Sequence, residues 1–110
     1  ESIAALISLE RYQIAQYGKF VGRLAQLKDG EGKLLDSTTV LFGSGMGDAN
    51  SHRNTDLPIL LAGGGYKHGT FREVAKEVRH KVPLCNLYVD IAQKLGVETE
   101  AFGSSTGRFA

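Results

Sequence analysis

The chain has 110 residues, of which 42% are hydrophobic, and this length and composition match one globular domain with a single core. Thirteen Lys and Arg residues oppose 12 Asp and Glu residues, which leaves a net charge of +1 spread along the chain. Aromatic residues are few, Trp is absent and no basic run is present. These features argue against a nucleic-acid-binding surface, and we expect no nucleic-acid partner.

The single cysteine, Cys85, excludes an internal disulfide, and its apolar neighbours predict a buried, unreactive thiol. No apolar run approaches the roughly 18 residues that a membrane span needs, and no signal peptide is visible. The chain starts at Glu1, without Met and already within an amphipathic pattern. We therefore expect a fragment of a longer protein, and the compartment stays open.

Residues 1–28 are predicted to form one long helix, because apolar side chains recur every three or four positions and so share a face. We expect this stripe to pack on the chain's own sheet. Gly18 and Gly22 each cost a helix about 1 kcal/mol relative to Ala, which suggests a close approach of the helix to that sheet. The predicted stripe is Ile3, Leu6, Ile7, Ile14, Tyr17, Phe20, Val21, Leu24 and Leu27.

The segment KDGEGK, residues 28–33, is predicted to end this helix in a turn. Residues 38–42 follow as an unbroken apolar strand of the kind that is buried on both faces. A second strand is predicted over residues 57–62, with Pro58 near its start, where a missing N–H is tolerated.

A glycine turn over residues 63–69 is expected to lead into a short edge strand at residues 70–72. Residues 73–82 fit a helix or an extended chain equally well. Pro83 opens a last helix that Gly96 ends, with an apolar stripe of Leu84, Leu87, Tyr88, Ile91 and Leu95. The predicted fold is therefore α/β, a sheet with flanking helices, in one domain or domain fragment spanning residues 1–110.

The loop between the two predicted strands is rich in glycine and polar residues, which raises the question of a cofactor. Gly64 and Gly69 have the glycine spacing of a P-loop, but Thr70 stands where that motif needs Lys. The residues after the first strand do not begin a helix, as a dinucleotide fingerprint requires.

Gly43, Gly45 and Gly47 follow the first strand and resemble motif I of adenosylmethionine-dependent methyltransferases, which makes them candidate cofactor-binding residues. Such enzymes place a crossover helix next, and then an acidic residue at the end of the second strand. This chain has too few residues for that helix, and its second strand ends in Ala62-Gly63. The methyltransferase-like domain stays an alternative.

A second resemblance covers about two-thirds of the chain. Its blocks are LLDSTTVLFGSGMGD, SHRNTDLPILLAGGG, VPLCNLYVDIAQKLGV and FGSSTG. In this order they resemble the C-terminal part of the alkaline phosphatase and sulfatase-like superfamily, and more closely a bacterial family of unknown function named for an HXXSHH pattern. The resemblance implies a piece of a metal-dependent hydrolase, inactive alone, whose partner is the upstream part of its parent protein. It also allows an exported bacterial protein.

The resemblance carries over only in part. An Asp-His pair ligates the catalytic metal at the end of the corresponding strand in phosphatase-like relatives, and Gly45 and Met46 stand there in this chain. The close family favours an acidic residue at Gly45. Asp48 and His52 remain as candidate ligands of a weakly bound divalent metal. The superfamily's nucleophile comes from a strand far upstream, so no catalytic residue is assigned.

A purely structural interpretation of the same loop stays open, because six of its residues are turn formers that bond their own backbone: Asp48, Asn50, Ser51, Asn54, Thr55 and Asp56. His68 and His80 have no partner at ligand spacing. Besides the hydrolase and methyltransferase hypotheses, the loop is compatible with a non-catalytic module that binds an anion or a partner.

Overall fold

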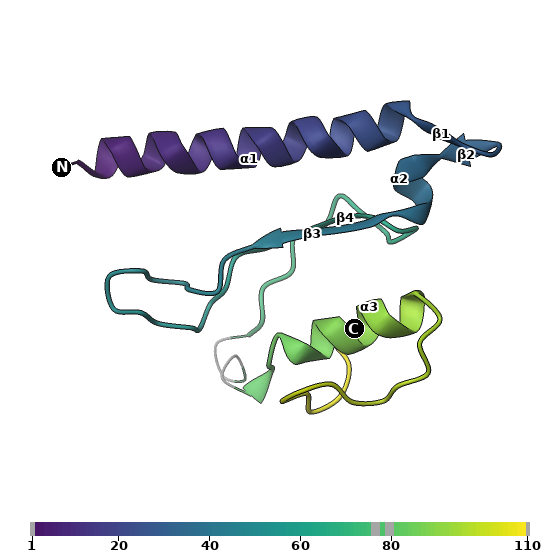
Figure 1. Ribbon diagram of the computed structural model, residues 1–110. Coiled ribbons are helices and arrows are strands. Elements are labelled where there is room, and N and C mark those ends of the chain that lie inside the picture. The colour runs from purple at the N-terminus through teal and green to yellow at the C-terminus, as the bar shows by residue number, and fades with distance from the viewer. Residues whose placement is uncertain (1, 76–77, 79–80, 110) are drawn as a thin grey trace. The chain divides into compact units, whose positions relative to one another are not determined.

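The computed structural model describes residues 2–75, 78 and 81–109, and its elements form a mixed α/β chain (Figure 1). Both sheets are two-stranded and antiparallel, one made of β1 and β2 and the other of β3 and β4. The predicted α/β class is confirmed at this level. In chain order the elements are α1 (Ile3–Gln26), β1 (Lys28–Asp29), β2 (Gly32–Lys33), α2 (Leu34–Ser37), β3 (Thr39–Gly43), β4 (Ile59–Gly63) and α3 (Cys85–Lys94).

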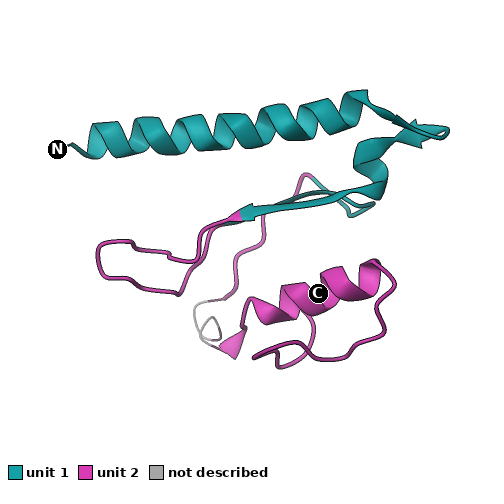
Figure 2. Cartoon of the chain, in the orientation of Figure 1, with its two compact units in different colours: residues 1–42, 59–68 teal, residues 43–58, 69–110 magenta. Residues whose placement is uncertain are grey.

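The chain divides into two compact units (Figure 2). The first contains residues 1–42 and 59–68, and the second contains residues 43–58 and 69–110. No helix in the described part of the chain combines the length and the apolar character that crossing a bilayer requires.

Helix α1 confirms the predicted long helix, but its apolar stripe is buried only towards its C-terminal end. Leu24 is buried and Tyr17 and Val21 are half-buried, with the Tyr17 ring centroid 5.2 Å from that of Phe42 in β3. The expectation that the whole stripe packs on the chain's own sheet is wrong for the remaining members, which are exposed: Ile3, Leu6, Ile7, Ile14, Phe20 and Leu27. The covered members of the stripe, Tyr17, Val21 and Leu24, lie within two turns of the helix, so the rest of the stripe has no cover.

The turn predicted at residues 28–33 is a small hairpin of β1 and β2, with Gly30 in the left-handed region at φ 57°. One helical turn, α2, follows and is held at its start by the Lys33 N–H, which donates to the Asp36 carboxylate at 3.0 Å. The Ser37 hydroxyl donates to Asp29 at 2.6 Å, so the hairpin and α2 are joined. The local chemistry of these polar residues thus reverses the chain between α1 and β3.

Strand β4 ends where its backbone meets α2. Gly63 is buried at φ 71°, and a Cβ placed on it would meet the carbonyl oxygens of Leu35 and Thr38. The Gly64 N–H donates to the Leu35 carbonyl at 3.1 Å. His68 bonds the Gly63 carbonyl through Nε2 at 2.8 Å. Only glycine fits this approach, because it has no Cβ and adopts positive φ without strain.

The two strands differ from their predicted burial. Leu41 in β3 and Leu60 in β4 are 38% and 43% exposed, so the prediction of a strand buried on both faces is wrong. Each strand of this two-stranded sheet has only one neighbouring strand, so some of its apolar side chains remain exposed. The edge strand predicted at residues 70–72 is also absent, and these residues have no regular structure. Residues 76, 77, 79 and 80 of the ambiguous segment 73–82 lie outside the described residues.

Helix α3 begins two residues after Pro83 and ends as predicted at Gly96. Gly96 has φ 84°. Its N–H donates to the Gln93 carbonyl, and the Val97 N–H donates to the Ala92 carbonyl. This is the 5→2 and 6→1 pattern of a Schellman motif. The predicted apolar stripe is only partly correct, since Leu95 is 63% exposed.

Replacing Gly63 by Ala tests the close approach at the end of β4. The new Cβ would meet two carbonyl oxygens in a left-handed conformation, so we expect a loss of about 2 kcal/mol or more in the free energy of unfolding. Gly18→Ala is the matched control, since no atom lies within 4 Å of its Cβ position, and it should raise that free energy by up to about 1 kcal/mol. Urea unfolding followed by circular dichroism measures both. Equal effects of the two substitutions would contradict the packing at Gly63.

Candidate functional site

The loop after β3 continues the antiparallel pairing of β3 and β4 towards its tip. The Ser44 N–H donates to the Pro58 carbonyl at 3.3 Å, and the Gly47 N–H donates to the Arg53 carbonyl at 2.8 Å. Asp48 and Arg53 form an isolated antiparallel bridge. Residues 44–58 are therefore a long hairpin, and its tip lies between Asp48 and Arg53.

The three glycines that resemble a cofactor motif have different roles. Gly43 ends β3. Gly47 lies against the carbonyl oxygen of Thr55, so a side chain at this position is blocked by the hairpin itself. Gly45 has open space around its Cβ position and no positive φ, so nothing in its surroundings requires glycine.

No helix follows these glycines within residues 44–58. A nucleotide-type cofactor bound after a strand typically uses the N–H groups at the start of such a helix. The geometry therefore provides no support for the cofactor-binding assignment of Gly43, Gly45 and Gly47, which remains a prediction from the sequence.

Asp48 organises the tip of the hairpin. Its Oδ1 accepts hydrogen bonds from the backbone N–H groups of Asn50 at 3.0 Å and Ser51 at 3.5 Å, and its Oδ2 accepts one from the Ser51 hydroxyl at 2.9 Å. These bonds favour the ionised carboxylate, and the Ser51 hydroxyl contributes most to lowering the pKa of Asp48 below its ordinary value. The turn-forming role that the sequence allows for Asp48 is confirmed.

His52 lies at the same tip, four residues after Asp48, and its side chain is exposed. Its backbone has φ 54°, a left-handed conformation that is uncommon outside glycine. Among the described residues, no three His, Cys, Asp or Glu side chains gather closely enough to hold a metal ion. Asp48 and His52 thus share one loop tip, and neither Gly45 nor Met46 adds a ligand to them.

The first turn of α3 carries features that sequence reasoning missed. Cys85 is half-buried, not buried as predicted, and the Ser104 hydroxyl donates to its sulfur at 3.4 Å. That hydrogen bond is the main reason why the pKa of the Cys85 thiol is lowered. The direction of this shift favours the thiolate, and the unreactive thiol remains a prediction from the sequence.

Two polar side chains on α3 hold the C-terminal segment. Asp90 accepts from the Arg108 Nε at 2.6 Å and from the Phe109 N–H at 3.0 Å. Asn86 accepts from the Thr106 N–H at 2.8 Å. Both Asn86 and Asp90 are buried, on either side of the fully buried Val89. Their spacing of four residues places both on one helix face, a signal visible in the sequence, whereas the C-terminal segment as their partner is seen only in the structure.

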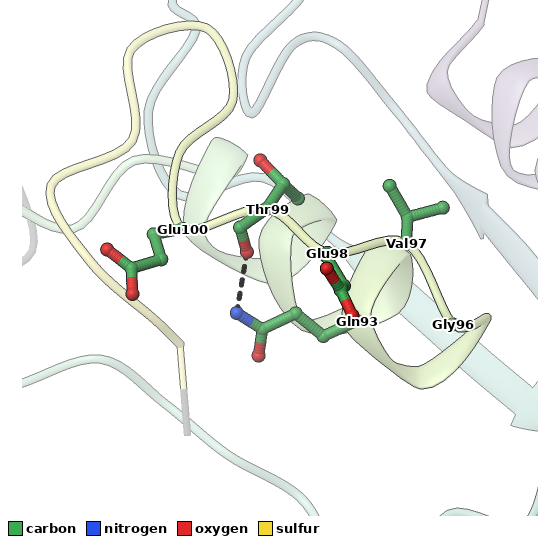
Figure 3. A pocket seen from close by; sticks show the side chains of 6 residues that line it. All are labelled: Gln93, Gly96, Val97, Glu98, Thr99 and Glu100. Atoms are coloured by element: carbon green, nitrogen blue, oxygen red, sulfur yellow. Dashed lines mark hydrogen bonds between the residues drawn. The ribbon is translucent and has the colours of Figure 1, made fainter.

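A shallow depression of about 580 Å³ lies at the end of α3 (Figure 3). It is lined by Gln93 and residues 96–100, and the Gln93 amide donates to the Thr99 carbonyl at 2.7 Å across it. Glu98 and Glu100 are its two charged residues, and both are exposed.

Comparison with known proteins leaves this geometry without an assigned relative. No protein-family model matches the chain, and neither the curated proteins nor the solved structures contain a significant match.

Replacing Ser51 by Ala tests the hydrogen bonds that surround Asp48. Loss of the hydroxyl donor should raise the pKa of Asp48 towards its ordinary value of about 3.9. Because folding lowers this pKa, the carboxylate stabilises the hairpin above pH 3.9 or so, and that contribution is lost as the pH falls through the lowered value. Carboxyl carbon NMR titration of both forms measures the change. A control variant, Asn54→Ala, lies outside these bonds and should leave the titration of Asp48 unchanged, whereas an equal midpoint in Ser51→Ala would contradict the assignment.

Replacing Asp90 by Ala tests the attachment of the C-terminal segment to α3. The variant loses two hydrogen bonds to a buried carboxylate, each worth about 1.5–3 kcal/mol, partly offset by removal of a buried charge. We expect a destabilisation of about 2–3 kcal/mol and much faster amide exchange at Phe109. Thermal unfolding and hydrogen-exchange NMR measure the two effects. Glu98→Ala, which removes an exposed carboxylate from the same unit, is the control. Slow exchange at Phe109 in Asp90→Ala would contradict the role of Asp90.

Proposed function

We propose that this chain is a C-terminal piece of a metal-dependent hydrolase that resembles the alkaline phosphatase and sulfatase-like superfamily, and that it has no activity by itself. The observation that supports the proposal is the position of Asp48 and His52 on one loop tip directly after β3, with β4 and then α3 following in the chain. This order of strand, polar loop, strand and helix is what the sequence resemblance implies.

The available donors are too few for a complete metal centre. One carboxylate and one imidazole supply two ligands, where protein zinc sites use three or four. Both oxygens of Asp48 already accept hydrogen bonds from Asn50 and Ser51, and these would compete with a metal. The residues present therefore do not hold a catalytic metal without further ligands, and no catalytic step is assigned to them.

The missing parts define the partner in this proposal. An upstream part of a longer parent protein would supply the nucleophile and the remaining ligands. The loop tip is suited to meet such a partner, because Asn50, Ser51 and His52 are exposed. The substrate class implied is a phosphate or sulfate ester, which the superfamily resemblance suggests.

Titration calorimetry with zinc tests this assignment of the loop. The unmodified chain should bind zinc weakly and show no phosphatase or sulfatase activity, because two ligands are available. Gly45→Glu places a carboxylate at the position where the resembled family favours an acid. Since Gly45 has open space and no positive φ, the variant should fold and bind zinc at least about tenfold more tightly.

Matched variants separate a ligand effect from a charge effect. Asn54→Glu adds the same charge to the same exposed hairpin and should not strengthen zinc binding. Combining Gly45→Glu with His52→Ala should abolish the gain. Tight zinc binding by the unmodified chain would contradict the two-ligand interpretation, and a folded Gly45→Glu variant with unchanged weak binding would overturn the metal-loop assignment.

A further inference from the structure

We draw no further inference here: the strongest candidate, the C-terminal segment that Asn86 and Asp90 hold along α3, carries nothing beyond the attachment already described, because nothing in the described part of the chain shows that the segment leaves the helix or what would take its place.

Discussion

The contact of Gly63 with the backbone of Leu35 and Thr38 is the constraint on which the first unit depends. The loop of residues 44–58 continues the pairing of β3 and β4 at one end of the strands, and a second contact fixes the opposite end. That contact is made by the buried Gly63, together with the Gly64 N–H that donates to Leu35. Since α2 is tied to the β1–β2 hairpin through Ser37 and Asp29, the same contact also links the sheet to the end of α1.

Asp48 in the hairpin loop fits two interpretations, a turn-forming role and a metal-binding role. Asp48 was expected either to shape a turn or to bind a metal, and its hydrogen bonds to Asn50 and Ser51 account for the first role fully. Those same bonds keep the carboxylate ionised, which is the state that a cation requires. A metal would still have to compete with these hydrogen bonds, so the hydrolase proposal depends on further ligands from elsewhere.

The two units differ in what fills their small cores. In the first, apolar contact is concentrated around Leu24 and the rings of Tyr17 and Phe42, and much of α1 extends beyond it. In the second, buried polar groups replace part of the apolar core, since Asp90 and Asn86 bond the C-terminal segment on either side of Val89. Buried polar groups are tolerated because each has hydrogen-bond partners.

The sequence by itself determined the local features: the extent of α1, the turn at Gly30, the Gly96 stop and the turn chemistry of Asp48. Each depends on residues within a few positions of one another, where spacing and backbone preference are sufficient. Only the tertiary structure decided which faces are covered, because burial depends on segments distant in the chain. It left Ile3, Ile7 and Ile14 exposed, and it brought Ser104 to Cys85. The proposed metal loop depends on both kinds of information. The sequence shows glycine at position 45, where the resembled family favours an acid, and the structure shows that no three possible metal-binding side chains gather among the described residues.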